Sequence, residues 1–310
     1  MIDKTQETRD YFDKNTEFWS SLFNESIYGT TTQRVRIVSN KINDLLDGEF
    51  SNKPRNEFTH LDFGCGTGQL AAISASMGIQ VIAVDIAPGM IDATKSEVEK
   101  VSADNARVFQ GGIDSLADIE TSSIDVFSAL GLIEYLTLTE LDVFLDNVTR
   151  ILRPGGRAYI GSRNRLFNIF SENKFTDLEV SLGEYDKLAA ELDSVYKWIA
   201  EDSLLKSLND AKKIEKFKDW AYPDELPHTS PVSVSQRIQY SVCDLSTRAI
   251  NNGLKVKDIN AVRFHPEKMA ILDPNTHSEL IDKINLTIDE YGDTKWAVPC
   301  SSSYILELLK

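Results

Sequence analysis

LDFGCGTGQL, residues 61–70, and VIAVDIAPGM, residues 81–90, decide the fold of this chain. In the first stretch, a short apolar run ends in three glycines at alternate positions, beginning at Gly64. In the second, an apolar run ends at Asp85, 21 residues after Gly64. Glycine lets a strand turn sharply into a helix while the backbone lies close to a ligand. Because an acidic residue about 20 positions past such a loop binds ribose hydroxyls, the two stretches predict a nucleotide site in a βαβ unit.

The glycine spacing separates two classes of nucleotide ligand. The dinucleotide fingerprint GxGxxG has its third glycine where the helix starts close to a pyrophosphate. Here Gly64, Gly66 and Gly68 follow the order GxGxG, and Gln69 stands where that fingerprint has glycine. This spacing disfavours NAD or a flavin. The stretch resembles motif I of the class I S-adenosylmethionine-dependent methyltransferases, and residues 81–91 resemble their ribose-binding second strand.

The resemblance covers the chain from His60 to Ser162 and resumes near Ser241. It implies S-adenosyl-L-methionine as the cofactor and a Rossmann-like fold, a doubly wound α/β arrangement around a seven-stranded mixed sheet. The organisation that follows has four parts: an N-terminal helical cover at 1–55, a cofactor-binding core at 56–162, a helical insertion after the fifth strand at 163–238, and a C-terminal completion of the core at 239–310.

Alternating strand and helix signals predict that the core sheet is largely parallel. The predicted strands lie near residues 60–64, 80–85, 106–110, 124–130 and 156–162, with a closing antiparallel pair at 254–262 and 302–309. Two helices are predicted before the core. The first carries Tyr11, Phe12, Trp19, Leu22 and Phe23, and the second ends at Gly48.

The periodicity becomes helical between Arg163 and Ile238. One apolar stripe consists of Leu188, Leu192, Val195 and Ile199, and a second consists of Leu204, Leu208, Ala211, Ile214 and Phe217. Insertions at the carboxyl edge of an open α/β sheet overhang the ligand crevice. We therefore expect this segment to form a mobile lid over the acceptor.

The resemblance also implies which residues contact the cofactor, with Asp85 on the ribose. The predicted set is Asp62, Gly64, Gly66, Gly68, Asp85, Ile86, Ile113, Asp114, Leu130, Gly131 and Arg36. Three members have an alternative role. Asp62 could only fix the loop, and Asp114 could cap a short helix. Arg36, like Arg34, could lie on a solvated helix face instead of reaching the cofactor carboxylate.

Methyl transfer is an in-line displacement, so the enzyme aligns the nucleophile and, for a hydroxyl acceptor, removes its proton. Histidine is the side chain best suited to that step. His265, which follows a predicted strand in RFHPEK, is favoured as the base over His228, and Tyr135 or solvent is the fallback. We place His60 in a buried strand and His277 in a surface loop.

The predicted reaction is methyl transfer to a hydroxyl, or less favourably an amine, of a polar small molecule, sugar or glycan. RNRLFNIFS at 163–171 with the later FHP at 264–266 resembles methyltransferases of bacterial sugar and surface-polysaccharide biosynthesis. Arg163 and Arg165 would bind an anionic group of the acceptor, or only pair with carboxylates. An aromatic, isoprenoid or natural-product acceptor is the alternative, which a largely apolar pocket would favour. A non-catalytic, cofactor-binding regulatory protein is a further hypothesis.

Composition limits other classes of function. With 310 residues, 42% of them hydrophobic and 26% charged, we expect one soluble domain with an elaborated lid. A net charge of −15 argues against nucleic acid as the substrate. The three cysteines follow neither a disulfide nor a zinc pattern, and we expect no metal. Neither a membrane span nor a signal peptide is recognisable, which predicts a cytoplasmic protein and leaves its oligomeric state open.

Overall fold

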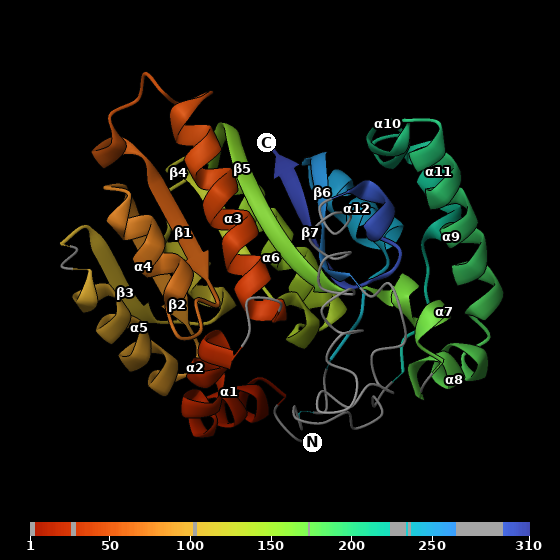
Figure 1. The fold of residues 1–310 in the computed structure, drawn as a ribbon, viewed down its shortest axis with the longest axis horizontal. Helices are drawn as coiled ribbons and strands as arrows, with labels where there is room; N and C mark the ends of the chain where they lie inside the picture. The colour runs from red at the N-terminus through yellow and green to blue at the C-terminus, as the bar shows by residue number, and fades with distance from the viewer. Residues whose placement is uncertain are drawn as a thin grey trace, which may run out of the picture.

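The computed structural model describes residues 4–25, 29–101, 104–172, 174–223, 234, 237–264 and 294–310. This part of the chain centres on one mixed sheet of seven strands in the order β3-β2-β1-β4-β5-β7-β6 (Figure 1). The strands are β1 (Thr59–Phe63), β2 (Gln80–Asp85), β3 (Ala106–Gln110), β4 (Ile124–Leu130), β5 (Leu152–Arg163), β6 (Lys255–Phe264) and β7 (Ser301–Leu309). Strands β1 to β5 are parallel, and β7 is antiparallel to both β5 and β6. The predicted sheet is confirmed.

Strand β5 differs most from its predicted bounds, because it begins before the RPGG turn and not after it. Leu152 already pairs with Ile124 of β4. The register then shifts, and regular pairing resumes where Arg157 lies opposite Val126. Irregular ladders of this kind take up extra residues without ending the strand.

Helices cover both faces of the sheet, with α3, α4 and α5 together on one face (Figure 1). The bounds are α3 (Thr30–Asp47), α4 (Gln69–Ser76), α5 (Pro88–Lys100), α6 (Leu138–Ile151) and α12 (Val242–Asn251). Successive residues of a strand point to opposite faces, so Val126 of β4 joins the apolar cluster of α3 and α4, and Phe127 joins the cluster of α6 and α12. Helix α6 starts with a capping box between Thr137 and Glu140.

The predicted first helix is in fact two helices, α1 (Lys4–Lys14) and α2 (Thr16–Glu25). The break falls at Asn15, whose side-chain amide donates to the carbonyl of Tyr11 over 2.7 Å. Beside it the Thr16 hydroxyl donates to the carbonyl of Phe12 over 3.1 Å. Polar side chains that bond the local backbone compete with helix continuation, which the apolar pattern alone does not reveal.

The described part of segment 163–238 is helical, as predicted. It contains η4 (Arg165–Phe167), α7 (Asn168–Ser171), α8 (Lys174–Ser181), α9 (Tyr185–Ala200), α10 (Leu204–Leu208), α11 (Ala211–Ile214) and η5 (Glu215–Phe217). The first predicted stripe is the inner face of α9, where Leu188 and Val195 are fully buried. The second stripe is divided among α10, α11 and η5. Helix α10 packs on β6 and α11 on α12, at the far edge of the sheet (Figure 1).

Short 3-10 turns complete the described chain: η1 (Arg55–Glu57), η2 (Ile113–Asp118), η3 (Ile133–Tyr135) and η7 (Lys295–Ala297). Because η2 follows β3 and η3 follows β4, both turns stand at the carboxyl edge of the parallel strands. None of the described helices is long and apolar enough to cross a membrane.

Candidate active site

A cavity of about 1280 Å³ lies at the carboxyl ends of the parallel strands. Asp62 of β1, Asp85 of β2 and Leu130 of β4 line it. Strand β1 has β2 on one side and β4 on the other, and open α/β sheets bind ligands where the strand order reverses in this way. The volume exceeds the roughly 300–1,000 Å³ of a pocket for one small ligand. The cavity therefore has room for two.

Helices α1 and α2 cover this cavity. They contribute Thr5, Thr8, Phe12, Phe18, Trp19 and Leu22 to its wall. The ring of Phe12 lies 5.5 Å from that of Trp19 and packs edge-on against Tyr135 of η3 at 5.2 Å. The backbone N–H of Gly89, at the start of α5, donates to the Asp13 carboxylate over 2.7 Å and fastens α1 to the core. These contacts agree with the predicted N-terminal cover.

The predicted lid contributes little to the wall. Of the described residues in 163–238, only Arg163, Phe167 and Arg237 line the cavity, and helices α8 to α11 line none of it. The reason is topological, because α10 packs against β6 and α12, and α11 against α12, at the opposite end of the sheet from β3, while α8 and α9 pack on one another and α9 also contacts α10. They do not form the predicted cover, and the mobility expected of the segment stays a prediction.

Most of the predicted cofactor residues meet at the cavity. Those that line it are Asp62, Gly64, Gly66, Asp85, Ile86, Ile113, Asp114, Leu130 and Gly131. Gly68 and Arg36 do not. The loop itself is held by β2, since the N–H groups of Gly64 and Cys65 both donate to the carbonyl of Val84, over 2.7 and 3.0 Å.

The glycines of the loop have different physical roles. Gly66 has a φ of +56°, and a Cβ added there would meet nothing within 4 Å. Gly68 has a φ of +88°, and its added Cβ would lie 2.6 Å from the Cα of Thr94 on α5. Gly66 therefore leaves open space at the wall. Gly68 instead lets α4 pack against α5, and it is not among the residues that line the cavity.

Asp85 is fixed by the backbone around it. Its Oδ1 accepts from the N–H of Ala87 over 2.9 Å, and its Oδ2 accepts from the N–H of Gly66 over 3.0 Å. Burial raises the pKa of Asp85 to about 6, although the Ala87 and Gly66 N–H groups lower it. Each oxygen retains further acceptor capacity at a residue that lines the cavity. The predicted ribose acceptor is therefore preorganised.

Asp62 lines the cavity and also belongs to a buried chain of hydrogen bonds, and its contact with the cofactor stays a prediction. The Ser128 hydroxyl donates to Asp62 over 2.6 Å, and His60 joins Ser128 at 2.8 Å and Ser74 at 2.9 Å. Burial raises the pKa of Asp62 to about 7 and lowers that of His60 to about 3. His60 is thus a neutral core histidine, as predicted.

Ile86, Ile113 and Asp114 form the part of the wall where adenine is predicted to bind. Ile86 and Ile113 are half-buried, and Asp114 is exposed. Gly112 is the N-cap residue of η2, and no side chain caps that turn. The alternative role of Asp114 as a helix cap is therefore wrong, and its carboxylate lies at the cavity wall.

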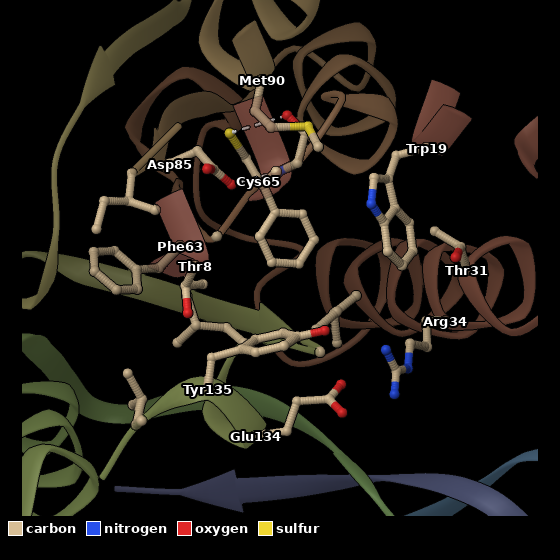
Figure 2. A pocket seen from close by; sticks show the side chains of 18 of the residues that line it. Thr8, Trp19, Thr31, Arg34, Phe63, Cys65, Asp85, Met90, Glu134 and Tyr135 are labelled. Atoms are coloured by element: carbon tan, nitrogen blue, oxygen red, sulfur yellow. Dashed lines mark hydrogen bonds between the residues drawn. The ribbon is translucent and has the colours of Figure 1, made fainter. Parts of the chain in front are cut away.

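Three arginines surround one buried carboxylate at the other end of the cavity. Glu134 is 4% exposed, and its Oε2 lies 3.1 Å from Nε of Arg237 and 3.4 Å from Nε of Arg163. The guanidinium of Arg34 faces the same carboxylate beside Tyr135 (Figure 2). Burial lowers the pKa of Arg34 and Arg163, and the charge of Glu134 raises it. All five side chains line the cavity.

Two predicted binding arginines lie elsewhere. Arg165, predicted to bind substrate, is 2% exposed and donates to the Glu179 carboxylate over 2.7–3.1 Å. Its guanidinium also stacks 4.6 Å from the Trp220 ring. Arg36 is exposed on α3 and does not line the cavity. Arg165 thus forms a structural ion pair with Glu179. On α3 it is Arg34, two residues before Arg36, that lines the cavity.

The predicted catalytic residues fall into two groups. Tyr135 lines the cavity, but burial first, and the charge of Glu134 second, raise its pKa far above the usual phenol range. A phenol with so high a pKa favours donating a hydrogen bond over accepting a proton, and the role of Tyr135 as the fallback base stays a prediction. His228 and His265 lie outside the described residues, as does His277. Among the described residues there is no group of side chains suited to a metal ion.

Glu134 and Arg237 were not predicted as site residues, whereas Arg34 was named with Arg36 as a candidate for the cofactor carboxylate. Arg34 lies four residues before Val38, on the apolar face of α3, whereas Arg36 lies off that face. Glu134 directly precedes Tyr135 after β4, where an acidic residue at the carboxyl edge is a candidate ligand. Arg237 carried no such signal, because the loop that positions it has no periodicity.

Comparison with known proteins finds a match for the part of the chain that forms the glycine-loop end of the cavity. Residues 61–160 match the family model described as "Methyltransferase domain". The chain carries a methyltransferase domain. The matched residues run from β1 through most of β5, so they contain the glycine loop and the strand ends of the cavity. The family resemblance of the sequence is thereby confirmed.

Two curated relatives are similar to part of the chain. A ubiquinone biosynthesis O-methyltransferase of Xanthomonas oryzae pv. oryzae is 29% identical over 105 residues, covering 34% of this chain and 43% of the relative. A tRNA 5-carboxymethoxyuridine methyltransferase of Escherichia coli is 28% identical over 145 residues, covering 46% and 54%. The chain thus spans about half the length of these relatives.

Two solved structures share the fold over almost the whole chain. The cyclase SpnF has a TM-score of 0.56 at 15% identity, covering 99% of this chain and 96% of its own. Magnesium protoporphyrin IX methyltransferase from Synechocystis PCC 6803, solved with bound SAH, has a TM-score of 0.53 at 12% identity, covering 99% and 100%. At these identities the likeness establishes the fold, a class I Rossmann-like methyltransferase fold, and not the substrate.

Proposed function

We propose that the methyltransferase domain binds S-adenosyl-L-methionine at the glycine-loop end of the cavity and transfers its methyl group to an oxygen of a second ligand. The observation that carries the proposal is the pairing of Asp85 with the N–H of Gly66, because it fixes a carboxylate beside open space at the loop. Asp85 would accept the ribose hydroxyls. The SAH bound in a structure of the same fold supports this assignment.

The remaining lining residues also suit this cofactor. Asp62 and the carbonyl of Gly131 would take the ammonium group, and Ile86 and Ile113 would enclose the adenine. Arg34 would take the carboxylate, since its Nη2 donates to Ser303 over 3.1 Å and its buried Nε has no partner among the described residues. When bound, the cofactor supplies an electrophilic methyl group on a sulfonium. The protein supplies alignment and exclusion of water.

The acceptor we propose is a small molecule with an apolar body and a hydroxyl group. The cavity wall supports this alternative over a sugar or glycan, because Phe12, Phe18, Trp19, Leu22 and Phe167 all line it. Aromatic and aliphatic walls with few polar groups favour apolar ligands. The O-methyltransferase relative supports oxygen as the nucleophile. His265 remains the predicted base, ahead of His228.

Titration calorimetry with SAH and NAD tests the cofactor assignment. We expect SAH to bind, NAD to be silent, and Asp85→Ala to weaken SAH binding by about 1–3 kcal/mol, the cost of removing a charged acceptor. Asp114→Asn, at the exposed part of the wall where adenine is predicted to bind, should weaken SAH binding less than Asp85→Ala does. Binding of NAD without SAH, or unchanged SAH affinity in Asp85→Ala, would contradict the proposal.

Release of SAH from S-adenosylmethionine in the presence of candidate acceptors tests the reaction. The panel should contain phenolic and isoprenoid hydroxyl compounds, sugars and tRNA, since one relative is a tRNA methyltransferase. We expect turnover with the apolar-bodied hydroxyl compounds and none with tRNA. Tight SAH binding with no turnover on any class would favour the non-catalytic hypothesis.

A further inference from the structure

The end of the cavity beyond Gly131 has an excess of positive charge. Arg34 comes from α3, Arg163 from the end of β5 and Arg237 from the segment before α12, and all three surround Glu134. One carboxylate against three guanidinium groups leaves a formal charge of +2. The whole chain carries −15, so this concentration of cations is opposite in sign to the average.

Burying this excess positive charge costs free energy unless another anion balances it. Arg34 is 9% exposed and keeps a buried Nε without a partner in the described structure. The Nε atoms of Arg163 and Arg237 share a single oxygen of Glu134. Buried charges in proteins are normally paired. The other lining carboxylates are those of Asp62, Asp85, Asp114 and Glu140. Asp62 and Asp85 are engaged at the loop end of the cavity, Glu140 is engaged in the capping box with Thr137, and Asp114 is exposed after β3.

The proposed cofactor supplies only part of the missing charge. S-adenosylmethionine carries one carboxylate against a sulfonium and an ammonium, and its carboxylate is assigned above to Arg34. Arg163 and Arg237 then still face the space of the second ligand with one shared counter-ion. Tyr135 lines the wall beside Glu134 (Figure 2), and its ring is near enough to Arg163 and Arg237 for their charges to lower its pKa, so an aromatic surface adjoins the two cations.

We propose that the acceptor is an anion, whose carboxylate or phosphate binds Arg163 and Arg237 while its apolar body lies under α1 and α2. This inference rests on the proposed function, because it assigns the second ligand of the same cavity. Guanidinium groups suit it, since their planar donors bind carboxylate and phosphate oxygens in pairs. Glu134 holds Arg163 and Arg237 in place through its ion pairs with them. Those ion pairs weaken when the anion of the ligand binds the same two guanidinium groups.

The test uses small probes and the full-length protein saturated with SAH. Benzoate and phenyl phosphate carry the two anionic groups, and benzamide is the neutral compound of matched shape. Calorimetry should detect benzoate or phenyl phosphate in the millimolar range and benzamide at least tenfold more weakly. Whichever of benzoate and phenyl phosphate binds more tightly shows whether the site prefers a carboxylate or a phosphate.

Variants locate the binding site. Arg163→Gln and Arg237→Gln should each weaken binding of the preferred anion by about tenfold to a hundredfold, the effect of one hydrogen bond to a charged group. Glu134→Gln should strengthen it, because the internal competitor is removed. Arg36→Gln, on the same helix as Arg34 but outside the cavity, is the matched control and should bind like the unaltered protein.

Two results would overturn the inference. One is equal affinity for benzoate, phenyl phosphate and benzamide. The other is undiminished anion binding in both arginine variants at normal SAH affinity and normal melting temperature. SAH affinity is measured first in every sample, so failure of the proposed cofactor site shows as absent SAH binding and is distinct from failure of the anion site.

Discussion

Substituting alanine at Gly66 and at Gly68 should separate ligand binding from folding within one loop. Both residues have a left-handed backbone, with φ of +56° and +88°, so both substitutions incur the same cost of about 1–2 kcal/mol for a side chain in that region. At Gly66 the added methyl meets nothing within 4 Å. At Gly68 it lies 2.6 Å from the Cα of Thr94, which is fully buried on α5.

The Gly68→Ala substitution therefore destabilises the fold by more than the backbone cost alone. Backbone cannot rotate away as a side chain can, so α4 and α5 must separate, and overpacking of this kind costs about 1–3 kcal/mol. We expect Gly68→Ala to lose about 2–5 kcal/mol of unfolding free energy and Gly66→Ala only about 1–2 kcal/mol. Conversely, Gly66→Ala should weaken SAH binding at least tenfold, because its methyl enters the cavity wall.

Urea unfolding monitored by circular dichroism measures the first quantity, provided that the slope with denaturant is the same in both variants. Calorimetry with SAH, carried out where both variants are folded, measures the second. If Gly68→Ala were as stable as Gly66→Ala, the close contact between α4 and α5 would not constrain the fold. If Gly66→Ala bound SAH normally, the loop would not face the cofactor.

Three further experiments follow. Arg165→Met should cost about 3–5 kcal/mol in urea unfolding by leaving Glu179 as an unpaired buried charge, and SAH affinity of the folded fraction should not change. SAH affinity should fall about tenfold per pH unit below pH 7 as Asp62 and then Asp85, with pKa values of about 7 and 6, take up protons; a flat calorimetric profile between pH 5.5 and 8.5 would contradict it. Deleting residues 2–25 should leave the melting temperature nearly unchanged, because none of the described side chains of α1 and α2 belongs to the two apolar clusters, but should abolish tight SAH binding.

The pH dependence has a counterpart in the stability of the ligand-free protein. Unfolded carboxyl groups titrate near pH 4, so between about pH 4 and 7 the folded state holds more protons at Asp62 and Asp85 than the unfolded state does. These two groups therefore make the free energy of unfolding fall as the pH rises through that window. SAH should offset the loss, which melting curves with and without SAH would show.

The local part of the site could be predicted from the sequence, because its geometry depends on neighbours in the chain. The loop from Gly64 to Gly66 and the end of β2 at Asp85 are set by strand-turn-helix rules that leave a mark in the residues themselves. The strands were predicted to within a few residues for the same reason. Only β5 differed substantially, since pairing of Leu152 with β4 depends on the partner strand.

The long-range part could not be predicted in the same way. Arg165 and Arg163 look equivalent in the sequence, and only the position of Glu179 on α8 draws Arg165 into the core. Arg237 reaches Glu134 across a separation of 103 residues. Nor did the helical stripes of α9 and α10 reveal that α9 packs against η4 and η7 and that α10 packs against β6. Such contacts depend on tertiary packing and not on periodicity.

The position of β7 has a consequence for how the protein is made. Strand β7 is the last of the described strands to leave the ribosome, yet it lies between β5 and β6 and pairs with both. Until it emerges, β5 has an open edge and β6 has no neighbour in the sheet, a state in which nascent chains associate wrongly. Ser303 on β7 also receives the hydrogen bond of Arg34. Emergence of β7 therefore completes the described sheet and, in the same step, supplies the Ser303 hydroxyl that holds Arg34.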